Sequence, residues 1–332
     1  MSKTNLSTLL LKWYDLNGRD LPWRVKGGAH PDPYVILVSE FMLQQTTVKT
    51  VIPYFERFMQ RFPNIESLAQ ADQEEVYLYW QGLGYYTRAR SLHNTAQIIM
   101  NDYKGNFPQT KQEILKLKGF GPYTVASFLA LAFNQPETVI DGNVIRIICR
   151  LYHLTEPTDK ITDKIRRLAE DLTDSAHASD YASAIMDLGA LICTPKNPLC
   201  NQCPWSDFCQ SKNLPDLEKI PNKTKISKTE KNGFVYLIFN NKKQIFIRKR
   251  TEPGLLTGLY EFPWSETPLY PNALNTNLNI SHVFTHIKLT LNIQTLHKNI
   301  PPTEGLFVNI NELSNYPLST LMKKVINIWL KK

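Results

Sequence analysis

The first two thirds of the chain repeat apolar residues at intervals of three and four positions, which predicts helices that each bury one face. The segments with this pattern are 34–47, 73–80, 88–100, 111–117, 122–132, 143–152, 161–173 and 180–191. Proline, glycine and asparagine separate them, as is typical of turns between helices. The pattern therefore predicts an all-α domain over residues 1–214.

The pattern changes after residue 214. Segment 215–231 contains two prolines, is rich in lysine, threonine and asparagine, and lacks an apolar period, so we expect an exposed linker there. Beyond it, short apolar runs predict strands and a last apolar period predicts a helix. The strands are expected at 234–239, 244–248, 283–293 and 306–309, and the helix at 318–330. The chain is thus predicted to have two domains, the second of the α+β class over residues 232–332.

The two parts also differ in charge. The whole chain has a formal net charge of +8, with 22 basic and 22 acidic residues in 1–215 but 16 basic and 8 acidic residues in 216–332. A basic second domain suits an anionic partner such as DNA, and we expect its affinity to fall with added salt. Its densest basic cluster is Arg248, Lys249 and Arg250, for which a solvated strand end is the alternative interpretation.

The sequence gives no sign of a membrane segment. It contains no run of 18 apolar residues, and Lys12 interrupts the short N-terminal apolar stretch, which is too short for the core of a signal peptide. We therefore expect a cytoplasmic protein. We also expect it to act as a monomer.

Four of the five cysteines lie close together at Cys193, Cys200, Cys203 and Cys209, separated by six, two and five residues. Thiolates at this density indicate a metal centre. Structural zinc usually uses two close pairs, whereas here one close pair is flanked by two wider gaps, so the spacing favours a cubane iron–sulfur cluster. Zinc and plain buried thiols remain alternatives. Cys149, inside an apolar helical segment, is expected to be a core thiol.

A glycine-containing turn joins two of the predicted helices. It carries Gly119 and Gly121, and Pro122 begins the second helix. Free N–H groups of such a turn, with the positive end of the following helix, can bind a phosphate without reading bases. We interpret the turn as a site for a DNA backbone, with an ordinary helical hairpin as the alternative.

Two carboxylates occur in contrasting settings. Glu40 lies inside a nearly continuous apolar helical segment, where burial raises a carboxyl pKa as a general acid requires. Asp141 directly precedes an apolar helix, where it can cap the helix and stay ionised to face a developing cation. Each alone has a structural explanation. As a pair with divergent pKa values, they are typical of glycosyl-bond cleavage.

As a set, these motifs resemble adenine DNA glycosylases of the MutY family. The matching segments are Leu21–Arg24, Ser39–Thr46, Gly82–Arg90, Gly119–Thr124, Asp141–Val144 and the four clustered cysteines, with weaker matches at Gly254–Pro263 and Phe284–His286. The resemblance implies a helix-hairpin-helix glycosylase domain with a [4Fe–4S] cluster on the four cysteines, followed by a Nudix-like domain that recognises 8-oxoguanine. It implies an enzyme that removes adenine mispaired with 8-oxoguanine or guanine in double-stranded DNA of the bacterial cytoplasm or nucleoid.

The resemblance also assigns catalytic roles. Glu40 would protonate the flipped adenine and help to deliver water, Asp141 would stabilise the oxocarbenium ion, and Asn143 would orient Asp141 or the water. Tyr123 occupies the place of a lysine in the related bifunctional glycosylases. Because a phenol cannot form a Schiff base, we expect hydrolysis without a lyase step.

The resemblance places DNA-binding residues in both domains. They are Trp23, Arg24, Gln45, Leu83, Tyr85, Gly119, Gly121, Thr285 and His286. Trp23 and Arg24 would line the pocket for the extruded adenine. Gln45 and Tyr85 would enter the double helix near the oxidised guanine, with core packing as the alternative for Tyr85.

The chain departs from the family pattern at three places. Ser183 stands where the family usually has glutamine or glutamate for adenine recognition, and a hydroxyl offers neither a carboxylate nor an amide. Thr285 replaces a serine but keeps the hydroxyl that would probe the lesion. After Glu261 the acidic helix of a working Nudix hydrolase is missing, so we expect this domain to bind and not to cleave.

Two other functions share some of these motifs. An endonuclease III-like glycosylase and lyase would carry the hairpin, the aspartate and the cluster, but Tyr123 in place of lysine argues against it. A non-catalytic iron–sulfur DNA-binding protein would keep only the hairpin and the cluster, and the presence of Glu40 and Asp141 argues against that.

Overall fold

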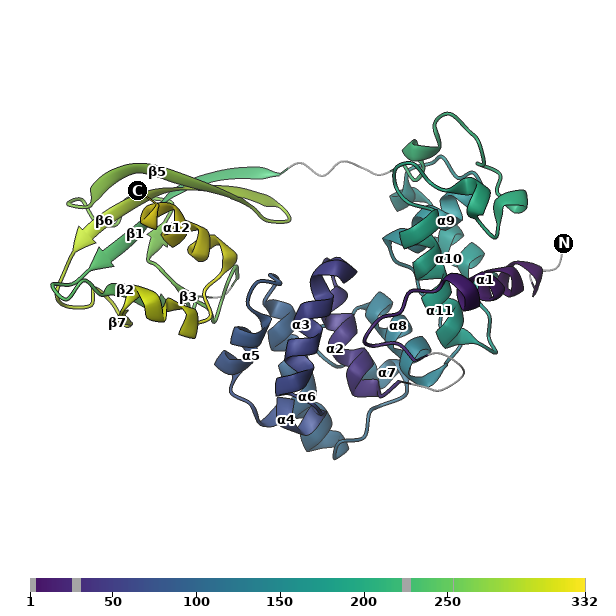
Figure 1. Cartoon of the computed structure of the whole chain (residues 1–332), viewed down its shortest axis with the longest axis horizontal. Coiled ribbons are helices and arrows are strands. Elements are labelled where there is room, and N and C mark those ends of the chain that lie inside the picture. Colours follow the sequence, from purple (N-terminus) through teal and green to yellow (C-terminus); the bar gives the residue numbers. More distant parts are fainter. Residues whose placement is uncertain (1–3, 26–30, 223–227, 253, 332) are drawn as a thin grey trace. The chain divides into compact units, whose positions relative to one another are not determined.

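The computed structural model describes residues 4–25, 31–222, 228–252 and 254–331. They form two compact units. The first contains the described residues up to 69 and from 94 to 222, and the second contains 70–93 and the described residues from 228 onward. Helices make up the first part of the chain, and strands dominate after residue 228 (Figure 1).

Eleven α-helices precede the strands in the described residues. They are α1 (Thr4–Asn17), α2 (Pro33–Leu43), α3 (Val48–Arg61), α4 (Ile65–Gln70), α5 (Gln73–Trp80), α6 (Thr87–Tyr103), α7 (Lys111–Ile114), α8 (Pro122–Phe133), α9 (Gly142–Leu151), α10 (Thr162–Glu170) and α11 (Ala178–Asp187). Every predicted helical segment overlaps one of them. Helices α1, α3 and α4 were not predicted. In α3, Val51, Phe55 and Phe58 are buried at helical spacing, but Pro53 lies inside the helix, where proline usually marks an end.

Helices α2 and α8 pack together in the first unit. Both begin with proline in the first turn, where its missing N–H costs no hydrogen bond. The Asp32 side chain caps α2 by accepting a hydrogen bond from the Tyr34 N–H at 2.8 Å. Almost every side chain in the middle of both helices is buried, which explains their continuous apolar sequence.

A second core of this unit surrounds α9. Leu10 and Tyr14 of α1 pack with residues of α9, α10 and α11, and Trp205 from the cysteine-containing segment joins them. The indole N–H of Trp205 donates a hydrogen bond to the Leu6 carbonyl at 2.8 Å. The N-terminal helix therefore helps to anchor the segment that carries the four cysteines.

The second unit contains a seven-stranded sheet with strand order β3-β2-β1-β6-β5; β4 pairs with β1, and β7 pairs with β2. Its elements are β1 (Thr229–Phe239), β2 (Ile245–Lys249), β3 (Tyr260–Glu261), β4 (Trp264–Ser265), β5 (Leu274–Val283), β6 (Ile287–His297), β7 (Leu306–Val308) and α12 (Thr320–Leu330). Strands β1 and β6 are parallel, and the other pairs are antiparallel.

Strand β1 is buried on both faces. Val235 and Leu237 belong to the core that includes residues of α12, whereas Tyr236 and Ile238 pack with Phe246 on the opposite face. A central strand of this kind reads as a continuous apolar run rather than an alternating one. This explains why residues 234–239 were easily recognised as a strand.

The predicted strand 283–293 is only partly correct, because residues 287–293 lie in β6 but a turn separates them from Val283, the last residue of β5. Residues Thr285 and His286 form a tight turn between β5 and β6, and the Phe284 N–H donates a hydrogen bond to the Ile287 carbonyl at 2.7 Å. Strand β5 was missed because asparagines alternate with its apolar residues and have low strand propensity. One of them, Asn277, has a φ of 60° at the irregularity between Asn275 and Leu278.

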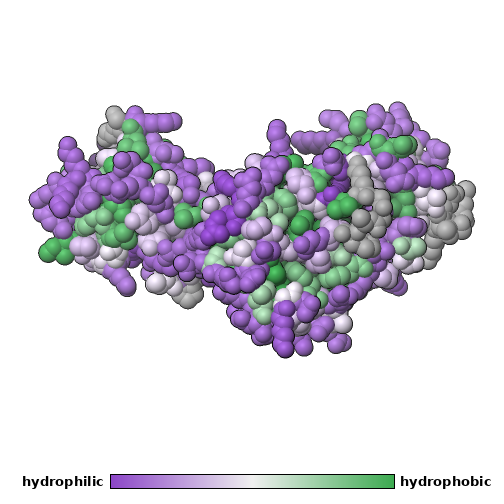
Figure 2. All heavy atoms as spheres, turned by 60° about the horizontal axis from the view of Figure 1, so that its bottom comes forward, coloured by the Kyte–Doolittle hydropathy of each residue, from purple (hydrophilic) through white to green (hydrophobic). Residues whose placement is uncertain are grey.

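The predicted linker 215–231 contains several kinds of structure. Residues Leu217–Lys219 form a 3₁₀ turn, 223–227 lie outside the described residues, and strand β1 begins at Thr229, where it pairs with Ile287. Hydrophilic side chains cover much of the face shown in Figure 2. Within the described ranges, none of the helices is long and apolar enough to span a membrane.

Candidate active site

A cavity of about 450 Å³ in the first unit brings together the residues predicted for chemistry. Of the predicted site residues, its walls contain Trp23, Arg24, Glu40, Tyr123, Asp141 and Asn143. They come from the segment after α1, from α2, from the start of α8 and from the start of α9. The volume is in the range of pockets that bind small molecules.

Glu40 is a buried carboxyl group of α2 with only 5 % of its surface exposed. Burial raises the pKa of Glu40 to about 7, a hydrogen-bonding influence of Ser127 lowers it, the charge of Asp141 raises it, and Arg24 lowers it. A carboxyl group with this pKa still carries a proton near neutral pH. It meets the electrostatic requirement for a general acid.

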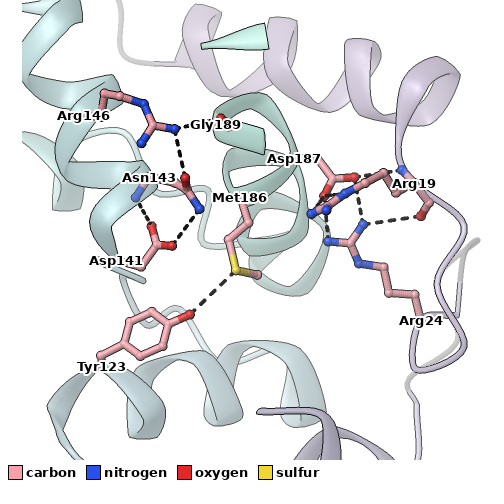
Figure 3. Close-up of polar contacts among 9 residues, drawn as sticks. All are labelled: Arg19, Arg24, Tyr123, Asp141, Asn143, Arg146, Met186, Asp187 and Gly189. Atoms are coloured by element: carbon pink, nitrogen blue, oxygen red, sulfur yellow. Dashed lines mark hydrogen bonds and ion pairs between the residues drawn. The ribbon is translucent and has the colours of Figure 1, made fainter. Parts of the chain in front are cut away.

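Asp141 caps α9 and is held at both oxygens. Its Oδ1 accepts hydrogen bonds from the N–H groups of Asn143 and Val144, each at 2.8 Å, and its Oδ2 accepts one from the Asn143 side-chain amide at 2.9 Å. The capping role and the site role therefore coexist (Figure 3). Anionic groups are stabilised at the positive end of a helix.

Asn143 is itself fixed by residues that the sequence analysis missed. Its Oδ1 accepts a hydrogen bond from Arg146 at 2.9 Å, and Arg146 also donates to the Gly189 carbonyl at 2.8 Å. A side chain at position 189 would clash, since its Cβ would lie 2.6 Å from the Asn143 Cβ. This network orients the amide that holds Asp141.

Tyr123 points from the first turn of α8 toward Met186 (Figure 3). Its hydroxyl donates to the Met186 sulfur at 3.8 Å, a weak acceptor. Burial, together with the charges of Glu40 and Asp141, raises the pKa of Tyr123 well above its ordinary value. The side chain therefore stays a neutral phenol that can donate a hydrogen bond.

A buried ion-pair network forms another part of the cavity wall. Asp187 is fully buried, and it accepts hydrogen bonds from Arg24 at 2.8 and 2.9 Å and from Arg19 at 2.6 to 2.8 Å (Figure 3). Burial opposes its ionisation, but these bonds hold the pKa of Asp187 below its ordinary value. The network fixes the Arg24 guanidinium at the cavity. The available sequence signal was a carboxylate, Asp187, that directly follows the apolar residues Ala184–Met186 of α11.

Ser183 lines the same cavity and is buried. Asp180 lies one turn earlier in α11 and also lines the cavity. The position that departs from the family pattern is therefore part of the site, and a carboxylate lies one helical turn away from it.

The four clustered cysteines line a second, small cavity of about 30 Å³ together with Arg150. Arg150 donates hydrogen bonds to the Thr194 and Pro195 carbonyls at 2.7 and 3.1 Å and contacts the Cys193 sulfur at 3.6 Å. Among the described residues, no three metal-binding side chains converge as a single ion would require. Four thiols around one space form a donor set that suits an iron–sulfur cluster.

The glycine turn between α7 and α8 has the predicted geometry. Gly119 has a φ of 90°, a left-handed value that favours glycine, and Gly121 is the N-cap residue of α8 without a side-chain cap. Both glycines are exposed. Gln45, at the end of α2, is exposed and has a φ of 57°. These residues offer backbone groups to a ligand at the surface.

The second unit has a cavity of about 540 Å³, lined by residues 84–87, 254–257, 282–287 and 319–321. The Tyr85 hydroxyl lies 3.2 Å from the Thr285 hydroxyl at its edge, and Tyr85 is 46 % exposed with a φ of 49°. His286 lies beside Thr285 in the turn between β5 and β6. Leu83 is only 6 % exposed, so its side chain lies in the interior and not at this surface.

The basic cluster at residues 248–250 is engaged inside the second unit. Arg248 and Arg250 donate to the buried carboxylate of Glu261 at 2.9 and 3.3 Å, and Lys249 donates to Glu74 at 2.6 Å. The arginines are thus paired inside the unit, whereas Lys249 is exposed at the end of β2, as the interpretation of a solvated strand end expects.

Comparisons with known proteins agree with this geometry. Residues 38–171 match the HhH-GPD superfamily of base excision DNA repair proteins, 193–209 the iron–sulfur binding domain of endonuclease III, and 234–327 the NUDIX domain. The adenine DNA glycosylase of Buchnera aphidicola subsp. Schizaphis graminum is 38% identical over 97% of this chain and 98% of its own. This chain belongs to the adenine DNA glycosylase family.

More distant relatives show the same relationship. The human adenine DNA glycosylase is 31% identical over 96% of this chain and 73% of its own. A thermostable thymine-DNA glycosylase has a structure with a TM-score of 0.56 and 29% identity, covering 63% of this chain and 96% of that chain. Endonuclease III in a non-covalent DNA complex shares the fold, with a TM-score of 0.52 and 19% identity over 64% of this chain and 97% of that chain.

Family membership makes the chain a DNA-repair glycosylase, a hydrolase of N-glycosyl bonds that acts on DNA. It also decides between the metal alternatives. The matched segment 193–209 identifies an iron–sulfur module, so the cofactor is a [4Fe–4S] cluster and not zinc. The ligands available to it are Cys193, Cys200, Cys203 and Cys209.

Proposed function

We propose that this adenine DNA glycosylase family member removes adenine paired with 8-oxoguanine or guanine in double-stranded DNA by hydrolysis, without a Schiff-base step. The observation that carries the proposal is one cavity whose walls contain the buried Glu40, with its raised pKa, and the helix-capping Asp141. Two carboxyl groups in such different settings can act as acid and as stabilising anion.

Glu40 begins the reaction as the general acid. An adenine extruded from the duplex into the cavity takes the carboxyl proton on a ring nitrogen, which makes it a better leaving group. The bond between the base and the sugar breaks, and its electron pair goes to adenine. The resulting Glu40 carboxylate can then accept a proton from the attacking water.

Asp141 stabilises the sugar cation that forms when the bond breaks. Its carboxylate is fixed by three hydrogen bonds and need not move as charge develops. Such preorganised electrostatic stabilisation is usually a large part of catalysis. Asn143, fixed by Arg146, keeps the second oxygen of Asp141 in place.

Tyr123 limits the reaction to hydrolysis. A covalent lyase step needs an amine that condenses with the opened sugar, and the phenol of Tyr123 cannot provide it. Its hydroxyl, bonded only weakly to Met186, is suited to donate a hydrogen bond to the DNA substrate instead.

Adenine recognition would use the side of the cavity that contains Ser183 and Asp180. The exocyclic amine of adenine is a hydrogen-bond donor, and the Asp180 carboxylate and Ser183 hydroxyl are acceptors one turn apart on α11. Trp23 and Arg24 line the same cavity and offer an apolar surface and a fixed donor. The departure at Ser183 thus need not remove adenine selectivity.

Recognition of the opposite 8-oxoguanine would use the cavity of the second unit. Tyr85 is exposed and Thr285 occupies a tight turn, and their hydroxyl groups lie 3.2 Å apart. Both can exchange their mutual hydrogen bond for one to a base. Gly119 and Gly121 would bind the phosphate backbone, and Gln45 lies exposed at the end of α2.

The cluster has a structural task in this proposal. When bound, it would cross-link the loop 193–209 through Cys193, Cys200, Cys203 and Cys209. Arg150 of α9 holds the same loop through the Thr194 and Pro195 carbonyls. We also propose that the enzyme acts as a monomer.

The test is single-turnover cleavage of four duplexes, with and without alkali. They contain adenine opposite 8-oxoguanine, adenine opposite guanine, adenine opposite thymine, and thymine glycol opposite adenine. We expect alkali-dependent scission of the adenine strand in the first two. Scission at thymine glycol without alkali would favour a lyase, and tight binding without any scission would favour a non-catalytic DNA-binding protein.

A further inference from the structure

Ser127 is a buried hydroxyl to which the reaction above gives no task. It lies in α8 with 0 % of its surface exposed, and its Oγ has no hydrogen-bond partner of normal geometry in the described residues. A buried polar group without a partner costs free energy, whereas an alanine there would not. A role in the site would explain its presence.

The position of Ser127 in α8 directs it toward the general acid. Tyr123 lies one turn before it and Leu131 one turn after it, and both line the cavity, so all three occupy the same face of the helix. Glu40 lies on α2, which packs against α8. Ser127 therefore lies beneath the cavity wall, between the residues that line it.

A second observation agrees with this placement. Burial is the largest influence on the pKa values of Glu40 and Tyr123 and raises both, and the Ser127 hydroxyl acts on both in the opposite direction. Its Oγ forms no hydrogen bond of normal geometry with any described residue.

We propose that Ser127 is a positioning residue for the general acid and that its hydroxyl forms a hydrogen bond with the Glu40 carboxyl group in both protonation states of that group. The inference rests on the proposed function. A hydroxyl accepts a hydrogen bond from a neutral carboxyl group and donates one to a carboxylate. When the Glu40 proton passes to adenine and the N-glycosidic electron pair follows to the base, the Ser127 O–H donates to the carboxylate left behind.

Other ionisable groups also surround Glu40. Those that line its cavity are Arg19, Arg24, Lys49, Tyr123, Asp141 and Asp180. A change at Ser127 leaves every one of these charges in place. A shift in the pH dependence of a Ser127 variant therefore reports the missing hydroxyl.

The first test is the pH profile of single-turnover adenine excision by Ser127→Ala. Because the hydroxyl favours the carboxylate, its loss should move the alkaline midpoint upward by roughly one pH unit and lower the plateau rate several-fold. Ser127→Thr keeps the hydroxyl and should restore the midpoint. Ser39→Ala is the matched control, since the buried Ser39 hydroxyl bonds to the Ile36 carbonyl of its own helix.

The second test needs no substrate. Thermal unfolding of Ser127→Ala followed over pH should show the same upward shift in the interval where Glu40 titrates. Unchanged midpoints in both experiments would overturn the inference. A lower rate at every pH, with reduced unfolding temperature and the wild-type midpoint, would assign Ser127 to packing alone. If the wild type fails to excise adenine, the proposed function fails, while the unfolding experiment still decides on Ser127.

Discussion

Glu40 links the chemistry of the site to the stability of the fold. Its pKa is about 7 in the folded chain against an ordinary value of 4.5, so the folded state binds the extra proton between these values. The free energy of unfolding must therefore fall as pH rises through this interval. Glu40, the proposed acid, thus lowers the free energy of unfolding at neutral and alkaline pH.

Glu40→Gln should remove this pH dependence. Relative to the wild type, the variant should gain on the order of 3 kcal/mol of unfolding free energy between about pH 4 and about pH 8. Urea unfolding at several pH values measures the difference. An equal difference at all pH values would mean that Glu40 does not titrate in this range.

Tyr123→Lys should introduce covalent chemistry. Burial disfavours the charged form of an amine at this position, which lies in the same cavity as Asp141 and Glu40. The amine should condense with the opened sugar, and borohydride should then trap the protein on DNA. Tyr123→Phe is the control, because it lacks the amine and should give no adduct. A folded lysine variant without any trapped species would show that Tyr123 does not lie beside the sugar.

Residues of the site were predictable where a polar group interrupted a regular apolar pattern. Glu40 and Asp141 stood out in this way, because one lies inside an apolar helix and the other directly before one. The bonds of Arg19 and Arg24 to Asp187 were not predictable, because the partners are 168 and 163 residues apart in the chain. Contacts of this kind depend on packing that local patterns do not encode.

At the scale of elements, the turn between α7 and α8 contains two glycines with different backbone conformations. Gly119 has a φ of 90°, so Gly119→Ala should strain the turn by about 1–2 kcal/mol and weaken binding to duplex DNA. Gly121→Ala adds a methyl group at the same phosphate site without straining the backbone, since its φ is −86° and a Cβ there would meet nothing within 4 Å. It therefore separates interference with the phosphate from strain in the turn. Anisotropy with a labelled duplex measures both variants, and wild-type affinity in both would contradict the assigned role of the turn.

The cysteine loop should depend on each of its ligands. Cys200→Ser should lose the visible absorbance of the iron–sulfur cluster and part of the stability of the loop, because a hydroxyl is a poor iron ligand. Cys149→Ala is the control, since Cys149 is a buried thiol of α9 that does not line the cavity of the four clustered cysteines. Full absorbance in Cys200→Ser would remove it from the ligand set.

Helices and strands were predictable where their apolar residues formed a clear pattern in the sequence. Helices α2 and α8 were found because most of their residues are apolar. Helix α3 was hidden by an internal proline, and β5 by asparagines that its pairing with β6 tolerates. In both, tertiary packing outweighs the local preference of a few residues.

At the scale of the whole molecule, the change from helices to strands was visible in the sequence. That residues 70–93 belong to the second unit was not. These residues group with the C-terminal strands, where the Gln81 side chain donates to the Tyr316 and Leu318 carbonyls at 3.2 and 3.1 Å. Such long-range bonds leave no local trace in a sequence.

The charge of the chain should make DNA binding sensitive to salt. The net charge is +8, and the excess lies after residue 215. We expect the logarithm of the affinity for duplex DNA to fall linearly with the logarithm of salt concentration, as cations are released from the phosphates. Anisotropy at increasing salt measures the slope, with an uncharged osmolyte as control. An affinity independent of salt would contradict phosphate binding.

The most direct test of the account is release of free adenine from a duplex with adenine opposite 8-oxoguanine, under single-turnover conditions, by the wild type and by Glu40→Gln. Glu170→Gln, an exposed change of the same kind on α10, is the control. We predict release by the wild type and the control, and none by Glu40→Gln, although it still binds the duplex. Adenine release by a folded Glu40→Gln variant at the wild-type rate would contradict the account.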